Sequence, residues 1–203
     1  MISRRNFLRA LVAGTAFLPF KNVYAKTDIT NNPPSPLLEP PVAEQADPFA
    51  KGGKGGSSDK KILNMYNIHT GEKLNIKYYS SGIYDRDAID KINYFLRCHY
   101  TNEVKEIDIR VLDLLCDIKD IVSREKEIQI ISGYRSIAYN EFLISQGRNV
   151  SRNTLHLHGL AIDFSIEGVS NGKLSRIAKS FAAGGVGKYP EFVHIDVGRV
   201  RYW

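Results

Sequence analysis

The sequence of 203 residues has only two cysteines, and this scarcity limits the chemistry that the chain can use. Two thiols cannot build the disulfide framework of a small secreted domain. Cys98 and Cys116 also lack the close spacing of a thiolate pair that binds structural zinc, and each lies among apolar neighbours with helical spacing. The pattern is compatible with two buried free thiols and, in an oxidising compartment, with one disulfide.

The chain also lacks a dense block of basic residues, although its formal net charge is +6. Four of its 28 basic residues and none of its 22 acidic residues lie within residues 1–25. Without that segment 24 basic and 22 acidic residues remain, so the net charge falls to +2. Because a nearly neutral protein has no electrostatic footprint for phosphates, we expect no binding to nucleic acid.

No apolar run is long enough for a confident transmembrane helix, since Leu11–Phe20 spans only ten residues. The preceding segment Ser3–Arg9 resembles a twin-arginine export motif, and Val23–Ala25 offers a small residue for cleavage. We therefore predict that residues 1–25 are a signal peptide for export to the periplasm, with no stable membrane span after cleavage. An uncleaved membrane anchor is the alternative, whereas a lipoprotein is excluded because no cysteine follows the apolar run.

Residues 26–60 have the composition of a linker. They hold six of the eight prolines, the glycine-rich run Gly52–Gly56 and a single aromatic residue, Phe49. Such a segment cannot bury enough apolar surface to offset the entropy that ordering costs. We predict a disordered spacer here and a folded domain at residues 61–203.

Apolar periodicity within residues 61–203 predicts an α+β domain. The expected strands are 62–68, 74–79, 127–131, 161–166, 192–197 and 199–202. The expected helices are 85–98, 108–122, 138–145 and 173–183. We expect a small, mostly antiparallel sheet with helices on one face and a metal site on the other.

Three potential metal ligands, His156, Asp163 and His194, give the clearest functional signal. Asp163 and His194 alternate with apolar residues in two predicted strands, so each lies on the face opposite the core. If these strands are antiparallel neighbours, the two side chains project together, and His156 joins them from the preceding loop. Two imidazoles and a carboxylate fill three positions of a tetrahedral Zn²⁺ site and leave the fourth for water, as in zinc hydrolases.

The segment Thr154–Asp163 resembles the Ser-x-His-x-x-Gly-x-Ala-x-Asp signature of the zinc D,D-peptidases, with threonine in place of the serine. That group includes VanX-type dipeptidases and the metal-bearing domain of hedgehog proteins. Ser132–Ser136 is similar to the family's Ser-Gly-Tyr-Arg segment. Three further segments resemble the murein endopeptidases of the MepK/YcbK type: Asn93–Arg97, Gly184–Gly187 and Phe192–Gly198.

The resemblance covers residues 61–203 and implies a hedgehog/D-Ala-D-Ala peptidase-like fold with Zn²⁺ as cofactor. It places the zinc ligands at His156, Asp163 and His194, and leaves His158 in a second-shell or exposed position. The resemblance implies a periplasmic murein endopeptidase that hydrolyses the peptide cross-links of peptidoglycan. The alternatives are a D,D-carboxypeptidase and a zinc-containing wall-binding module without hydrolysis. A regulator protein would suit such a hydrolase, but no residue identifies one.

The general base has two candidates. The family often has an acid three residues before the last histidine, which is Glu191 here, whereas strand alternation favours Asp196 because it shares a face with His194. We expect the other carboxylate to orient a ligand imidazole. Arg135 lies between a predicted strand and a predicted helix, and we expect it near the rim of the site, binding a substrate carboxylate or the developing oxyanion.

Overall fold

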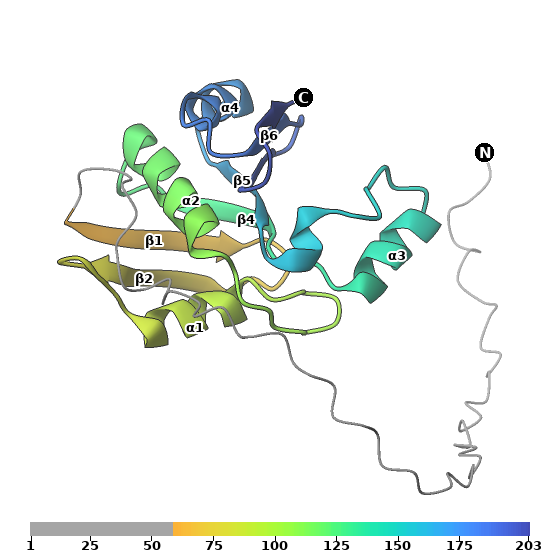
Figure 1. The fold of residues 1–203 in the computed structure, drawn as a ribbon, viewed down its shortest axis with the longest axis horizontal. Coiled ribbons are helices and arrows are strands. Elements are labelled where there is room, and N and C mark those ends of the chain that lie inside the picture. Colours follow the sequence, from red (N-terminus) through yellow and green to blue (C-terminus); the bar gives the residue numbers. More distant parts are fainter. Residues whose placement is uncertain (1–58) are drawn as a thin grey trace, which may run out of the picture. The chain divides into compact units, whose positions relative to one another are not determined.

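The computed structural model describes residues 59–203, which form one sheet, four α-helices and a short 3₁₀ helix (Figure 1). The strands are β1 (Lys60–Asn67), β2 (Lys73–Ser80), β3 (Ile83–Tyr84), β4 (Ile128–Ser132), β5 (Ala161–Ile166), β6 (Gly185–Lys188), β7 (Val193–Asp196) and β8 (Arg201–Tyr202). The helices are α1 (Arg86–Phe95), α2 (Ile109–Val122), α3 (Ile137–Ser145), η1 (Leu155–His158) and α4 (Asn171–Ser180). The predicted signal peptide, 1–25, and the predicted linker, 26–60, lie outside the described residues except for residues 59 and 60, and Lys60 already begins β1.

The α+β class is confirmed, but the sheet is mixed and larger than expected. Its eight strands have the order β3-β2-β1-β4-β5-β7-β6-β8. The β1–β4 and β6–β8 pairs are parallel, and the other pairs are antiparallel. Two strands, β3 and β6, were not predicted, because one has only two residues and the other has glycine at two of its four positions.

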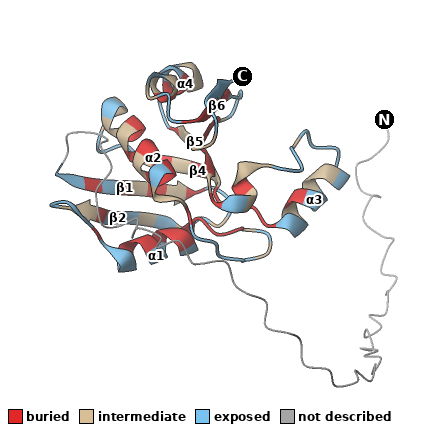
Figure 2. Cartoon of the chain, in the orientation of Figure 1, coloured by how far each residue is buried: buried red, intermediate tan, exposed pale blue. Residues whose placement is uncertain are grey.

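The core lies between one face of the sheet and three helices. Ile130 of β4 pairs with Phe164 of β5, and Ile162 pairs with Ile195 of β7, so their apolar side chains share a face. They form a single buried cluster with residues of α1, α2 and α4, whereas no residue of α3 belongs to it. The distribution of buried residues follows this arrangement, with α1 and α2 strongly buried on the side that meets the sheet (Figure 2).

The helices begin where their capping residues are. Asp85 accepts a hydrogen bond from the backbone N–H of Ala88, and Asp108 accepts one from that of Arg110, so each aspartate is the N-cap of its helix. The predicted helices 85–98 and 173–183 are shorter in the structure and end at Phe95 and Ser180. Within residues 59–203, no helix combines the length and the apolar character that a membrane span requires.

Candidate functional site

Two neighbouring inner strands of the sheet, β5 and β7, place Asp163 and His194 opposite each other. Asp163 on β5 pairs directly with His194 on β7, in the antiparallel register that the alternation predicted. Both side chains lie on the face away from the helical core, and each is at least nine-tenths buried. His194 Nδ1 lies 2.8 Å from Asp163 Oδ1. The sheet therefore fixes two of the three potential ligands through its backbone register.

His156 reaches the same point from a short helix, not from an open loop as expected. It lies on η1, whose N-cap is Thr154 and whose C-cap Gly159 has a left-handed backbone with φ of +68°. A Cβ atom at Gly159 would also collide with the backbone oxygen of Glu106. Glycine is thus required at this position of the motif, since it allows both the turn and the close approach that direct His156 inward.

The three ligand atoms form a triangle of the size that a zinc ion requires. His156 Nε2 lies 3.2 Å from His194 Nδ1 and 3.2 Å from Asp163 Oδ1, which completes the triangle with the 2.8 Å side. In an ideal tetrahedral site with metal–ligand distances of about 2.0 Å, neighbouring ligand atoms are about 3.3 Å apart. The observed triangle fits one face of that tetrahedron. Among the described residues, this is the one group of three that could hold a metal ion.

Hydrogen bonds from the outer ring nitrogens to oxygen acceptors orient both imidazoles. Nδ1 of His156 lies 2.8 Å from the carbonyl oxygen of Gly133, and Nε2 of His194 lies 3.1 Å from Asp196 Oδ2. If each outer nitrogen carries the proton and donates it, the inner nitrogen of each ring presents a lone pair to the centre. This tautomer pair is the one that a metal ion needs.

The pKa values of the two histidines and of Asp163 depend on burial and on one another. Burial lowers the pKa of the His156 imidazole, which favours its neutral form. Burial alone would raise the pKa of Asp163, but the imidazoles of His156 and His194 bring it well below its ordinary value. For His194, burial opposes protonation, yet hydrogen bonds to Asp163 and Asp196 raise its pKa to about 8. Asp163 therefore remains an anion that attracts a cation.

Asp196 is placed behind His194, on the side away from Asp163. Its carboxylate is fully buried, and its Oδ1 accepts hydrogen bonds from the backbone N–H groups of Gly185 and Gly198, both at 2.9 Å. Its Oδ2 accepts one from Arg201 Nη2 at 2.7 Å, besides contacting His194. Alternation correctly placed Asp196 on the His194 face. The hydrogen bonds around this carboxylate suit an orienting group better than a proton-transferring one.

The remaining residues that the sequence analysis considered, Arg135, Glu191 and His158, lie at different distances from the three candidate ligands. Arg135 is buried beside Asp163, with Nη2 3.5 Å from Asp163 Oδ2, and not at the rim of the site as expected. Glu191 is exposed in the turn between β6 and β7, and it does not line the cleft above the three ligands. His158 is exposed on η1 and is not part of the ligand triangle.

The cleft above the triangle has a volume of about 560 Å³, and its wall includes residues that the sequence did not reveal. Arg201 and Trp203 arrive from β8 and the residue after it, and Tyr189 follows β6. The indole of Trp203 lies 5.4 Å from the His194 ring, and its Nε1 donates a hydrogen bond to Tyr189 Oη at 2.9 Å. A Cβ atom at Gly187 would come within 2.6 Å of this indole. Glycine in β6 therefore makes room for the wall, which explains part of the Gly184–Gly187 motif.

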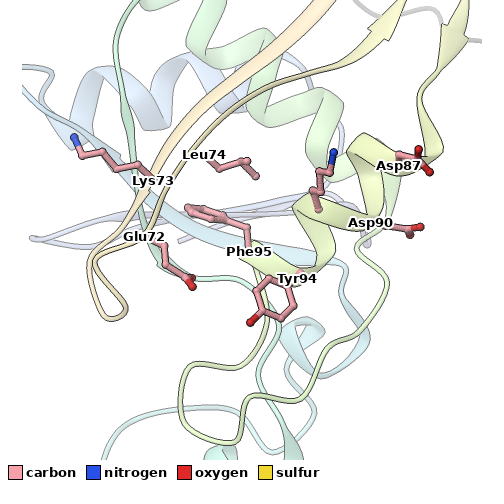
Figure 3. A pocket seen from close by; sticks show the side chains of 8 residues that line it. Glu72, Lys73, Leu74, Asp87, Asp90, Tyr94 and Phe95 are labelled. Carbon is pink, nitrogen blue, oxygen red and sulfur yellow. The ribbon is translucent and has the colours of Figure 1, made fainter.

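A second hollow of about 580 Å³ lies between β2 and α1, away from the metal ligands (Figure 3). Two of its charged groups form ion pairs with residues outside the hollow: Glu72 binds Arg97 at 2.9 Å, and Lys73 binds Glu127 at 2.9 Å. No cluster of potential metal ligands adjoins it among the described residues. The chemistry of the described domain is therefore concentrated at the cleft over β5 and β7.

Comparisons with known proteins point to one family. The model of the family described as peptidoglycan L,D-endopeptidase MepK matches residues 56–203. The chain is 39% identical over 145 residues to peptidoglycan L,D-endopeptidase MepK of Escherichia coli, an alignment that covers 70% of this chain and 80% of the relative. It is 37% identical over 146 residues to the probable peptidoglycan L,D-endopeptidase MepK of Haemophilus influenzae, covering 70% and 78%. No solved structure gave a significant match.

Proposed function

The chain belongs to the family of peptidoglycan L,D-endopeptidase MepK, and from this membership we propose that it hydrolyses L,D-peptide bonds in the cross-links of peptidoglycan. The family is one of peptidoglycan hydrolases of the metallopeptidase class. The single observation that best supports the activity in this chain is the triangle of His156, Asp163 and His194 at the floor of an open cleft.

We propose Zn²⁺ as the cofactor and these three side chains as its ligands. Two nitrogens and one carboxylate oxygen suit zinc, and a fourth position facing the cleft remains for water. A bound zinc ion supplies Lewis acidity, which polarises the scissile carbonyl and lowers the pKa of bound water to about 7. The carbonyl of Gly133 and the carboxylate of Asp196 hold the two imidazoles in the required orientation.

The remaining polar groups of the cleft have distinct proposed roles. Arg135 keeps a positive charge beside Asp163 and faces the cleft, where it can stabilise negative charge that develops on the substrate. Glu191 remains the candidate that moves the proton from water to the leaving amine, because Asp196 is already bound by its neighbours. Glu191 stands between Tyr189 and Phe192, which both line the cleft, so a modest movement of this turn would bring its carboxylate toward the substrate.

The activity is proposed to take place in the periplasm. Residues 1–25 would direct export by the twin-arginine route, and residues 26–60 would give the domain reach within the cell wall. Twin-arginine export would suit a protein whose metal site is completed before it crosses the membrane. A protein regulator would limit the activity, as befits an enzyme that cuts a structural polymer.

Digestion of purified peptidoglycan sacculi tests the proposal. The full chain with zinc is expected to convert cross-linked muropeptides into uncross-linked fragments, identified by mass spectrometry. His156→Ala should reduce this release at least 100-fold, whereas His158→Ala, an exposed histidine two residues away, should retain it. Bound sacculi without fragments would instead indicate a wall-binding module, and loss of terminal D-alanine alone would indicate a carboxypeptidase.

A further inference from the structure

Helix α3 is apolar on all of its sides, yet it is not part of the core. Six of the nine residues in Ile137–Ser145 are apolar or aromatic, and Asn140 is the only one of the nine that is buried. The side chains of Ile137 and Phe142 are 65% and 40% exposed. A helix that is apolar all round is normally buried, and an exposed apolar patch commonly marks a binding surface. Figure 2 shows α3 standing apart from the other helices, with exposed segments along it.

Aromatic rings on this helix stack with a ring from another part of the chain. Tyr100, in the segment between α1 and α2, lies parallel to both Tyr139 and Phe142 of α3, with 5.1 Å between ring centroids in each pair. The rings of Tyr139 and Phe142 are 6.4 Å apart and inclined by only 19°. Tyr100 nevertheless remains 52% exposed. The rings of Tyr100, Tyr139 and Phe142 are called the aromatic surface below.

The aromatic surface is held next to the catalytic cleft. Arg135, which lines the cleft, immediately precedes Ser136, the N-cap of α3. Asn140, on the inner side of α3, accepts a hydrogen bond from Arg135 at 3.4 Å and donates one to the backbone oxygen of Ser151 at 3.1 Å. Ser151 also lines the cleft. These contacts connect the helix on one side to the floor of the cleft and on the other to its wall.

The cleft is too small for a whole cross-linked polymer, so its volume bears on what the aromatic surface binds. A space of about 560 Å³ accommodates a few residues of a peptide, so the rest of a cross-linked polymer must lie over neighbouring surfaces. In peptidoglycan the peptides are attached to strands of N-acetylated sugars. A pyranose ring has a face of C–H bonds that can pack flat against an aromatic ring, and its polar substituents remain at the edge, in water.

We propose that the aromatic surface binds the glycan strand to which the cleaved peptide is attached, an inference that rests on the proposed function. The three residues of the surface are uncharged, which suits a neutral sugar better than an anionic lipid headgroup. The neighbouring loop 147–153 supplies asparagine, serine and arginine side chains, which can form hydrogen bonds with hydroxyl and acetamido groups. The surface would thus direct the enzyme to peptides that are still attached to glycan.

The test separates recognition of the glycan from hydrolysis of the peptide. Binding of the full chain is measured by sedimentation with intact sacculi and by titration with two soluble probes, peptide-free glycan strands and glycan-free cross-linked peptides. The variant Tyr100→Ala/Phe142→Ala is expected to lose affinity for sacculi and glycan strands about tenfold or more, since two stacking faces are removed. Its rate of hydrolysis of the glycan-free peptides should equal that of the wild type.

Two further variants serve as controls. Tyr94→Ala removes a tyrosine that is 57% exposed on α1, outside the aromatic surface. It should leave the binding of sacculi, of glycan strands and of glycan-free peptides unchanged. Tyr100→Phe retains the ring and should keep the affinity for glycan. Thermal unfolding checks that each variant is folded, and if the double variant is not, Phe142→Gln, at an exposed position, replaces it.

The outcomes distinguish this inference from the proposed function. Unchanged binding of sacculi and glycan strands by the double variant would overturn the inference, as would an equal loss of hydrolysis on glycan-free peptides. Weaker binding to vesicles of anionic phospholipid, with glycan binding intact, would assign the surface to a membrane instead. Because sedimentation requires no hydrolysis, the inference can hold or fail even if the wild type cleaves neither substrate.

Discussion

The two candidate bases differ in surroundings, so their substitutions should have different effects. Asp196 orients His194, and Asp196→Asn should therefore weaken zinc binding about 10- to 100-fold. Glu191 is exposed and contacts none of the three ligands, so Glu191→Gln should retain zinc affinity and lower turnover about 100-fold or more if it transfers the proton. Competitive zinc titration and the rate of muropeptide release measure the two effects.

The two variants, Glu191→Gln and Asp196→Asn, also show which carboxylate transfers the proton. If Glu191→Gln has wild-type turnover, Glu191 is not the base, and the proton must move through another group of the cleft. If Asp196→Asn keeps zinc and loses turnover alone, its role is chemical and not orienting. Sequence reasoning left both residues open because it showed that Asp196 shares a face with His194 but not that its oxygens are occupied by Gly185, Gly198 and Arg201.

His99 should make the stability of the domain depend on pH. Its partial burial, with the nearby His69 and Arg135, lowers its pKa from 6.5 to about 4. Between those values the unfolded chain binds a proton at this position more readily than the folded chain. Protonation of His99 therefore favours the unfolded chain. The free energy of unfolding has its full value above pH 6.5 and decreases as the pH falls toward 4.

Urea unfolding with a chelator present, at pH 7 and pH 4.5, measures this contribution. The wild type should lose roughly 1 kcal/mol more than His99→Gln between the two conditions, after allowance for the partial exposure of His99. His158→Gln, at an exposed position, should behave like the wild type. An identical loss in wild type and His99→Gln would show that this histidine does not couple protonation to folding.

At the scale of elements, regular alternation was the most reliable predictor. Strands β5 and β7 were expected at 161–166 and 192–197 and are found at Ala161–Ile166 and Val193–Asp196. Their alternation is clear because one face meets an apolar core and the other a polar site. The pairing of Asp163 with His194 followed from the same pattern. The proximity of the candidate metal ligands was therefore the part of the site that local sequence could predict.

Two elements, β6 and η1, were not predicted from the sequence, because their residue types are determined by contacts with distant parts of the chain. Strand β6 contains Gly185 and Gly187, which weaken any strand pattern, yet both are glycine because Asp196 and Trp203 occupy the space of a side chain. Helix η1 has four residues, too few for a helical period, and it depends on the cap at Thr154 and the turn at Gly159. Neither feature has a local signal independent of the fold.

The cap of η1 yields a prediction with a matched control. Gly159→Ala places a Cβ atom against the oxygen of Glu106 in a left-handed backbone, whereas Gly147→Ala meets only the backbone strain, since nothing lies within 4 Å. Each should cost about 1–2 kcal/mol of strain, and Gly159→Ala about 1–3 kcal/mol more. Chemical denaturation measures the free energies of unfolding. Equal losses would mean that the backbone near Glu106 moves away freely, and zinc affinity should then also be unchanged.

For the whole molecule, we expect the fold to be largely independent of the metal. The core between the sheet and helices α1, α2 and α4 is continuous, and a domain of about 140 residues does not need an ion as its core. A chelator should abolish hydrolysis and added zinc should restore it, while the far-UV circular dichroism spectrum changes little. Collapse of that spectrum on chelation would assign a structural role to the ion.

The full set of residues that line the cleft could not be predicted from the sequence. Arg201 and Trp203 are distant in the chain from His156, and only the parallel pairing of β8 with β6 brings them to the site. Conversely, spacing along the chain made Glu191 a candidate base but did not show that its side chain is exposed in a turn and is not among the residues that line the cleft. Local patterns predicted ligands and strands, whereas the order of strands across the sheet determined which further residues adjoin them.

The three proposed metal ligands are anchored unequally, and this has a consequence for how fast the ion would exchange. Asp163 and His194 face each other on strands that are paired on both sides, so they separate only if the sheet opens. His156 lies on a four-residue helix at the end of the loop 147–154, and loops open far more often than central strands. The ion should therefore enter and leave by displacement of His156. Its residence time would be set by the opening of one loop, and exchange would proceed without unfolding of the domain.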